Sequence, residues 1–218
     1  MQKQNGLIFA ADLKERRKTL NLTRKISDYI DAVKVNYPLV LSTGAEIISD
    51  LSDITDVIAD FKLADVPHIN SRISKIAFNK GASAVICHAF TGEESLKSCT
   101  KTASEFDGEV YSVVNMSHPG SEDVMDSSLP KLCEISKKAD IDGVIAPGNQ
   151  PDKIEMIKNK IDTKILSPGI GAQGGKGKKA ISAGADYIIV GRSIYDSTDP
   201  VKSAKKIRDN IKMYYSNE

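Results

Sequence analysis

The chain has 218 residues, of which 40% are hydrophobic and 27% are charged, as in an ordinary soluble globular protein with a full core. Lys and Arg number 30 and Asp and Glu 29, so the formal charge is only +1. This balance excludes a general electrostatic field for nucleic acid or an anionic membrane, although it is compatible with a local anion site.

Eight short apolar, β-branched segments recur along the chain, separated by amphipathic patterns. The predicted strands are residues 7–11, 32–35, 57–61, 84–88, 109–115, 143–146, 164–167 and 187–190. Helical periodicity is clear over residues 70–79, 93–105 and 200–214. Strands that alternate with helices predict a parallel sheet, and closing eight such units gives a TIM barrel. We therefore expect one (β/α)8 barrel domain over residues 1–218, with an open doubly wound sheet as the alternative.

The cysteines and the N-terminus indicate the compartment. Cys87, Cys99 and Cys133 are odd in number and lack the spacing of a zinc site or a disulfide framework. The apolar stretch of residues 7–11 ends at Asp12, and no run approaches the roughly 20 apolar residues of a membrane span. We expect a cytoplasmic protein that contacts neither membrane nor nucleic acid.

Polar residues and glycines gather where the predicted strands end. In a barrel these positions share the C-terminal face, where the active sites of the fold are built. The candidate site residues are Asp12, Lys34, Asp60, Lys62, Asp65, Ser117, Pro168, Gln173, Gly191 and Arg192.

The segment of residues 60–65 carries the strongest chemical signal. Side chains alternate along a strand, so Asp60 and Lys62 point to one side and Phe61 to the other. Lys34 on the adjacent strand can complete a row of alternating charges, which would keep Lys62 protonated as a general acid. The structural alternative is an ion network that braces the barrel mouth, with Asp65 capping the next helix.

Residues 167–175 form a glycine-rich loop, and residues 191–193, Gly-Arg-Ser, follow the last strand. The loops after strands 7 and 8 are the usual phosphate site of a TIM barrel, and Arg192 would add a bidentate donor. The alternative is a loop that needs glycine only for its turns. The pattern is neither a Walker nor a Rossmann fingerprint, so no nucleotide cofactor is predicted.

Residues 115–120 end the fifth strand in a turn. Ser117 can hydrogen-bond a polar ring edge there. Ser117 and His118 can also be interpreted as a nucleophile and base, but adjacent loop residues rarely face each other and no third group orients His118. A hydrolase is therefore disfavoured.

Together these segments resemble the orotidine 5′-monophosphate decarboxylase family in its short archaeal-type form. The resemblance covers the chain almost end to end and keeps the family's order. The matching stretches are residues 11–12, Lys34, 60–65, 116–120, 168–175 and 191–193. The Asp-Lys-Asp motif alone belongs to a wider superfamily, whereas its combination with Lys34 and the Gln173 loop is much more specific.

The resemblance implies a decarboxylase that makes UMP in de novo pyrimidine biosynthesis. Lys62 is similar to the lysine that protonates C6 as carbon dioxide leaves, and Asp60 to the aspartate beside the departing carboxylate. Lys34 resembles the lysine that holds Asp60 and a ribose hydroxyl. Asp65 resembles an aspartate that enters the partner subunit's site, so a homodimer is implied.

The same resemblance assigns the substrate contacts. Asp12 is similar to a ribose contact, and Ser117 to the pyrimidine contact. Gln173 and Arg192 match phosphate ligands, and Pro168 and Gly191 lie in the matching substrate-binding stretches. Members use neither a metal nor an organic cofactor. One departure is visible: many members carry threonine where this chain has Ile69, which cannot make that residue's hydrogen bond to the partner's ribose.

Two other functions are compatible with parts of the pattern. A sugar-phosphate decarboxylase or epimerase of the same superfamily would need Mg²⁺ and an acidic residue where Lys34 stands. A non-catalytic protein that binds a phosphate ligand would not need both Asp60 and Lys62. The sequence therefore favours the cofactor-free decarboxylase.

Overall fold

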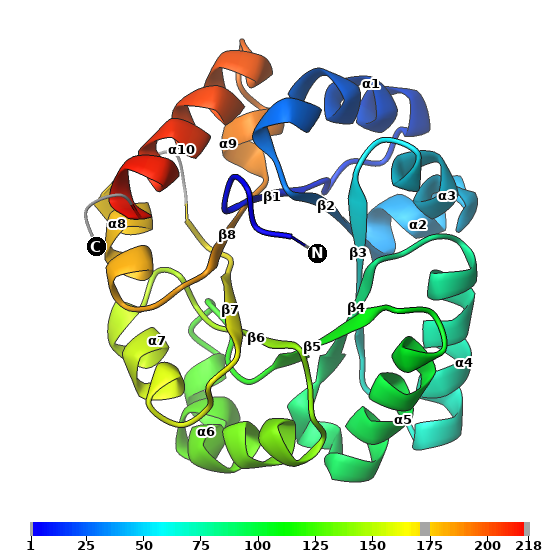
Figure 1. Ribbon diagram of the computed structural model, residues 1–218, viewed down its shortest axis with the longest axis vertical. Coiled ribbons are helices and arrows are strands. Elements are labelled where there is room, and N and C mark those ends of the chain that lie inside the picture. Colours follow the sequence, from blue (N-terminus) through cyan, green and yellow to red (C-terminus); the bar gives the residue numbers. More distant parts are fainter. Residues whose placement is uncertain (1, 171–174, 216–218) are drawn as a thin grey trace.

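Eight parallel strands close into a barrel, with β1 paired to both β2 and β8 (Figure 1). The computed structural model describes residues 2–170 and 175–215. The strands are β1 (Leu7–Ala10), β2 (Ala32–Asn36), β3 (Asp56–Leu63), β4 (Ala84–His88), β5 (Glu109–Val113), β6 (Gly143–Ile145), β7 (Lys164–Ser167) and β8 (Tyr187–Val190). The predicted TIM barrel is confirmed, and the open sheet is wrong.

Helices occupy the connections and surround the barrel (Figure 1). They are α1 (Arg16–Ile26), η1 (Ser27–Tyr29), α2 (Tyr37–Thr43), α3 (Glu46–Ser52), α4 (Pro67–Asn79), η2 (Ala89–Thr91), α5 (Glu93–Ser104), α6 (Ser121–Lys138), α7 (Pro151–Lys158), α8 (Gly175–Ser182), α9 (Arg192–Tyr195) and α10 (Pro200–Tyr215). Strands β4, β7 and β8 have their predicted bounds. Strand β3 extends two residues further than predicted and so includes Lys62, while β5 ends two residues earlier.

The strands are mostly apolar because both of their faces are covered. Leu7, Ile8 and Phe9 of β1 are each fully buried, although successive side chains point to opposite faces. One face packs inside the barrel and the other against the helices, as expected for a parallel sheet. Polar side chains inside the strands are few, and buried Ser112 of β5 is one that has a partner, since its hydroxyl lies 2.7 Å from that of Ser136.

The register of β1, β2 and β3 brings polar residues of these strands together at the carboxyl ends. Ala10 lies beside Lys34, and Asn36 lies beside Asp60. At the opposite end of the barrel, the Lys164 ammonium lies 2.7 Å from Glu109, which also accepts a hydrogen bond of 2.6 Å from the Tyr111 hydroxyl. Each end of the barrel thus carries its own lysine–carboxylate network.

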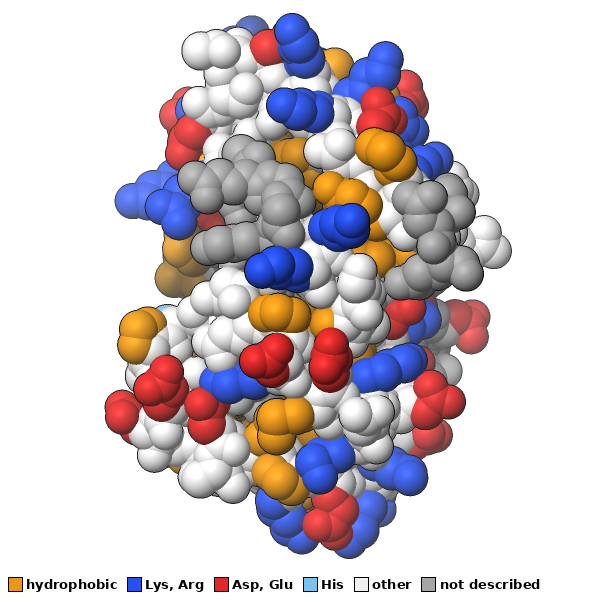
Figure 2. Space-filling model, turned by 90° about the vertical axis from the view of Figure 1, so that its left-hand side faces the viewer, with side chains coloured by type: hydrophobic (Ala, Val, Ile, Leu, Met, Phe, Trp, Pro, Cys, Tyr) orange, Lys and Arg blue, Asp and Glu red, His pale blue; other side chains and the backbone are white. Residues whose placement is uncertain are grey.

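The face that carries α7, α8 and α10 has charged side chains of both signs, with hydrophobic side chains in small groups among them (Figure 2). This mixture agrees with the near-zero net charge. Within residues 2–170 and 175–215, no helix combines the length and the apolar character needed to cross a bilayer.

Candidate active site

A cavity of about 600 Å³ opens at the carboxyl ends of the strands. Its volume lies in the range of small-molecule sites, about 300–1,000 Å³. All eight strands or their following loops contribute polar groups or apolar walls. The lining includes Asp12, Lys34, Asn36, Asp60, Lys62, Asn115, Met116, Ser117, Pro168, Gly191 and Arg192. Eight of the ten sequence-predicted site residues are therefore brought together.

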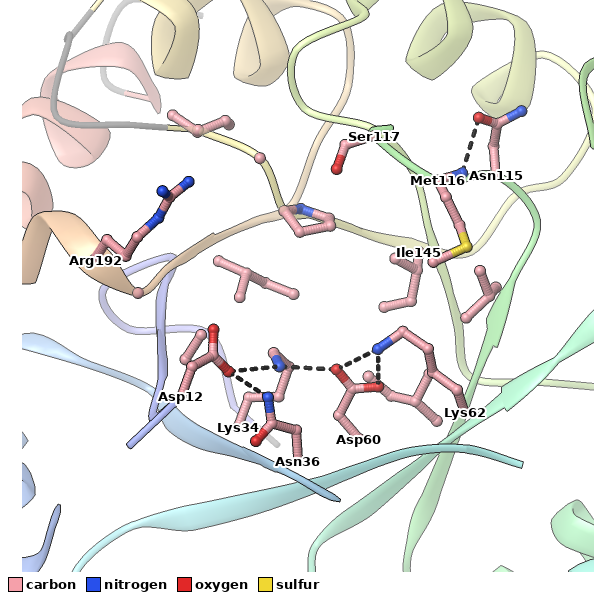
Figure 3. A pocket seen from close by; sticks show the side chains of 18 of the residues that line it. Asp12, Lys34, Asn36, Asp60, Lys62, Asn115, Met116, Ser117, Ile145 and Arg192 are labelled. Atoms are coloured by element: carbon pink, nitrogen blue, oxygen red, sulfur yellow. Dashed lines mark hydrogen bonds and ion pairs between the residues drawn. The ribbon is translucent and has the colours of Figure 1, made fainter. Parts of the chain in front are cut away.

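Four charged side chains form a row along one wall of this cavity (Figure 3). Asp60 accepts a hydrogen bond of 2.8 Å from Lys34, and its two oxygens lie 2.8 and 2.9 Å from the Lys62 nitrogen. The Lys34 nitrogen also lies 3.8 Å from Asp12. The predicted row of alternating charges is therefore present, and Asp60 at its centre accepts hydrogen bonds from both lysines.

The two lysines determine the charge of Asp60, which is only 5% exposed. Burial by itself raises the pKa of this carboxyl, but Lys34 and Lys62 outweigh burial and hold the pKa below its usual value. Asp60 is therefore an anion flanked by two cations. Such an arrangement fixes charges in place before any ligand arrives.

Lys62 occupies an unusual backbone position. Its φ of +42° lies in the left-handed region, and the pairing of β3 with β4 shifts register between Ala59 and Leu63. For a residue other than glycine this conformation costs about 1–3 kcal/mol, and it occurs where surrounding structure enforces it. Phe61 turns away, as predicted, and stacks on Tyr37 with ring centroids 5.5 Å apart. The bulge therefore directs Lys62 toward Asp60 and the cavity.

Asn36 is a cavity residue that the sequence analysis missed. Its amide nitrogen donates a hydrogen bond of 2.6 Å to Asp12, which lies at the end of the charged row. Asn36 is the last residue of β2, two positions after Lys34, so strand alternation places both on the same side. That spacing was the signal that could have identified it.

Part of the cavity lining is apolar, and the sequence analysis missed it as well. Ile86, Val113, Ile145 and Ile189 line it from β4, β5, β6 and β8. In sequence these residues are indistinguishable from barrel core, because each belongs to a continuous apolar strand. These apolar side chains lower the effective dielectric constant of the site and so strengthen the electrostatic effect of the charged row.

Ser117 and Arg192 face the charged row from across the cavity (Figure 3). Ser117 is half-buried, and its neighbour His118 points to solvent, so the structure does not pair them as nucleophile and base. Pro168 and Gly191 border the cavity next to Arg192. Gln173, the remaining predicted phosphate ligand, lies outside the described residues.

Asp65 is not brought into this cavity. It is exposed, and its carboxylate accepts a hydrogen bond of 2.7 Å from the backbone N–H of Val66. Val66 is the N-cap residue of α4, and no side chain caps that helix end, so the alternative of Asp65 as the helix cap is wrong. Within one chain, the expected grouping of Asp65 with Asp60 and Lys62 is not observed.

His88, the last residue of β4, lies electrostatically close to the charged row. Burial lowers the pKa of His88 to about 4, with a further contribution from Lys62 that the negative charge of Asp60 opposes. Its ring packs on Phe90 at 4.7 Å between centroids. His88 is thus neutral near pH 7. Among the described residues, no cluster of three or more His, Cys, Asp or Glu side chains is arranged for a metal ion.

A closed (β/α)8 barrel with this charged cavity at the carboxyl ends of its strands is a TIM-barrel enzyme. Residues 5–207 match the orotidine 5′-phosphate decarboxylase / HUMPS family, and the chain belongs to that family. It is 45% identical over 213 residues to orotidine 5′-phosphate decarboxylase of Methanococcoides burtonii, a match that covers 97% of this chain and 99% of the relative.

Solved structures of the family show the same barrel. Orotidine 5′-phosphate decarboxylase from Pyrococcus horikoshii OT3 superposes with a TM-score of 0.89 at 41% identity, covering 94% of this chain and 99% of that one. The enzyme from Methanocaldococcus jannaschii complexed with inhibitor BMP also gives a TM-score of 0.89, at 39% identity, covering 94% and 97%. The resemblance inferred from the sequence motifs is therefore confirmed.

Proposed function

We propose that this enzyme converts orotidine 5′-monophosphate to UMP and carbon dioxide without a cofactor, with Lys62 as the proton donor. The observation that carries the proposal is the anion Asp60 held between Lys34 and Lys62, all three at the cavity wall. Full-length relatives that are orotidine 5′-phosphate decarboxylases support the same reaction.

The reaction breaks the bond between C6 of the pyrimidine and the carboxylate carbon. Carbon dioxide leaves, the electron pair stays at C6, and a proton from the Lys62 ammonium completes the C6–H bond. A fixed cation stabilises the negative charge that develops at C6, because it needs no reorganisation during the reaction. Asp60 lies beside the departing carboxylate, where repulsion raises the energy of the bound substrate and is relieved as carbon dioxide leaves.

The remaining contacts hold the substrate around this centre. Asp12 and Lys34 bind ribose hydroxyls, and Ser117 binds the pyrimidine edge. The 5′-phosphate is bound at the end of the cavity formed by Pro168, Gly191 and Arg192, together with Gln173. The exposed guanidinium of Arg192 faces the cavity and can form a bidentate pair with a phosphate. Binding energy from the phosphate, far from the breaking bond, then assists catalysis.

We also propose a homodimer in which Asp65 of one protomer completes the site of its partner. Asp65 is exposed and does not line its own chain's cavity, so it is available to a second subunit. Large apolar side chains are exposed after β2, β3 and β4 on the same flank of the barrel: Leu41 at 81%, Val66 at 50% and Phe90 at 58%. A second copy would cover this apolar surface. Ile69 replaces the threonine of many relatives and removes one contact to the partner's ribose.

The chain acts as one domain over residues 1–218, and we place it in the cytoplasm. Cys87, Cys99 and Cys133 are all buried thiols without a disulfide, which supports a reducing compartment. The balanced charge supports a small-molecule substrate rather than nucleic acid or a membrane.

The deciding experiment follows the conversion of orotidine 5′-monophosphate to UMP by absorbance, with and without EDTA. We expect turnover that is unchanged by EDTA, and none with the Lys62→Ala variant. No conversion to UMP, together with activity on a sugar phosphate that disappears with EDTA and returns with Mg²⁺, would instead indicate the sugar-phosphate enzymes of the superfamily. The ammonium of Lys34, 2.8 Å from Asp60, argues against that outcome because it would repel a metal ion there.

A further inference from the structure

A buried amide and a partly buried ion pair lie behind the loop that carries Ser117. Asn115 follows β5 and is fully buried at the cavity wall. Its side-chain oxygen accepts a hydrogen bond of 2.9 Å from the backbone N–H of Met116, and its side-chain nitrogen donates one of 2.9 Å to Asp126. Asn115 therefore connects the backbone at Met116 to a carboxylate on α6.

Asp126 is held in turn by α7. The Lys153 nitrogen lies 2.6 Å from both of its oxygens, and the two side chains are 18% and 28% exposed for Lys153 and Asp126. Lys131 and Glu134, an ion pair on the same helix, are 64% and 46% exposed. Hydrogen bonds from Asn115 and then Lys153 keep the pKa of Asp126 below its usual value. One carboxylate thus joins the segment after β5 to α6 and α7.

Ser117 is also restrained by the two following loops. Its carbonyl oxygen accepts a hydrogen bond of 3.2 Å from Asn149 after β6. Gly169 after β7 has a φ of +88°, and a Cβ there would come within 3.0 Å of the Ser117 Cβ. The loops after β6 and β7 therefore also restrain Ser117.

We infer that Asp126 and Lys153 are positioning residues for pyrimidine recognition, which act through Asn115 on the backbone of Met116 and Ser117. Neither residue lines the cavity, so neither touches the substrate. Hydrogen-bond strength falls steeply with distance and angle, so a small shift of the loop weakens the Ser117 contact. The inference rests on the proposed function, because it assumes a pyrimidine ligand at Ser117.

A test compares ligands with and without a pyrimidine. In Asp126→Ala and Lys153→Met we expect UMP to bind tenfold to a hundredfold more weakly, the scale of an ångström-sized misplacement. Ribose 5-phosphate, which lacks the base, should bind as it does to the wild type. Lys131→Met removes a lysine from an exposed pair and is the matched control, with no change for either ligand.

A conservative variant separates positioning from bulk stability. Asp126→Asn keeps an acceptor for Asn115, so it should recover most of the UMP affinity that Asp126→Ala loses, even though the charge for Lys153 is gone. In a Ser117→Ala background, Asp126→Ala should weaken UMP binding no further, because the contact it positions is already absent. Circular dichroism confirms folding, and Lys153→Met provides the test if Asp126→Ala does not fold.

Equal weakening for UMP and ribose 5-phosphate, or no weakening for UMP in folded variants, would overturn the inference. So would full additivity with Ser117→Ala. A wild type that binds UMP but does not decarboxylate orotidine 5′-monophosphate would contradict the proposed function alone, since the binding comparison does not depend on turnover.

Discussion

Two lysine–carboxylate networks lie at opposite ends of this barrel, and their local geometry is nearly the same. Lys62 lies 2.8 Å from Asp60 at the carboxyl ends of the strands, and Lys164 lies 2.7 Å from Glu109 at the amino ends. The two lysine side chains are 38% and 37% exposed. An ion pair of a given length and burial is therefore not by itself a sign of catalysis.

What differs is the surroundings of each network. Asp60 is shared by two lysines and opens onto the large cavity, with Asp12 beyond. Glu109 is shared by Lys164 and the buried hydroxyl of Tyr111, and neither Glu109 nor Lys164 borders that cavity. Burial and the charge of Glu109 both raise the pKa of Tyr111, so this hydroxyl stays protonated. The network of Glu109, Lys164 and Tyr111 at the amino ends of the strands, the lower network, braces the barrel. The network of Asp60, Lys34 and Lys62 at the carboxyl ends, the upper network, can act on a ligand.

The test with the largest expected effect replaces one lysine by alanine at each end of the barrel. Lys62→Ala should lower kcat by about 10⁴-fold while leaving a folded protein that still binds UMP, because a contact made in the transition state is lost. Lys164→Ala should change kcat less than threefold and lower the free energy of unfolding by about 1 kcal/mol. Steady-state kinetics and urea unfolding measure both. Comparable kcat losses would show that position in the barrel does not distinguish the two lysines.

The activity of the upper network should also depend on a second subunit, through Asp65 of the partner subunit, whereas the lower network lies within one chain. Asp65→Ala and Lys62→Ala should each give nearly inactive homodimers. After dissociation and equal mixing, about half of the dimers are hybrids, each with one site that has both native residues, so about a quarter of native activity should return. If mass-tagged hybrids form without recovering activity, Asp65 acts within its own chain.

Arg192 lies across the cavity from the upper network and is the proposed ligand of the 5′-phosphate. Arg192→Ala should weaken binding of UMP about tenfold to hundredfold, the effect of losing hydrogen bonds to a charged group. Orotidine, which lacks the phosphate, should respond little to the same change. Isothermal titration with both ligands measures this, and equal losses would remove Arg192 from the phosphate site.

The last expected effect is a pH dependence of stability that originates at the carboxyl ends of the strands, where His88 ends β4. The pKa of His88 is about 4 in the folded protein against 6.5 for a free histidine, so the unfolded chain takes up the proton first. The contribution of neutral His88 to stability is complete above pH 6.5 and is lost progressively as the pH falls toward 4.

Urea unfolding at pH 7.0, 5.5 and 4.5 should therefore show a shallower pH slope for His88→Gln than for the wild type. The pKa of Asp60 is lowered from 3.8, so its own contribution is lost only at still lower pH and does not interfere. An unchanged slope in His88→Gln would show that His88 titrates as it does in the unfolded chain.

Much of the upper network could be predicted because it follows from strand geometry. Alternation places Asp60 and Lys62 on one side, and the barrel order places Lys34 on the neighbouring strand. Both expectations rest on regular repeats that the sequence displays directly. The left-handed backbone at Lys62 has no such signal, since it results from the shift in the β3–β4 pairing.

Other parts of the site could not be predicted for physical reasons. Asp126 and Lys153 lie on the two helices that follow Asn115 in the chain, and both have the pattern of ordinary surface residues. Val113 and Ile145 line the cavity only because they are the last residues of β5 and β6. An apolar run in the sequence does not reveal the residue at which its strand ends. Asp65 follows the strand in a loop, where alternation no longer fixes the direction of a side chain.

The backbone of Lys62 has a consequence for attempts to engineer this enzyme. A left-handed φ is tolerated most easily by glycine and asparagine, whereas position 62 carries a lysine, for which this φ is unfavourable. A mutant library scored only by melting temperature should therefore enrich Gly or Asn at position 62, and each such gain in heat resistance would yield a dead catalyst. Selection for durability in this barrel has to be coupled to a screen for turnover.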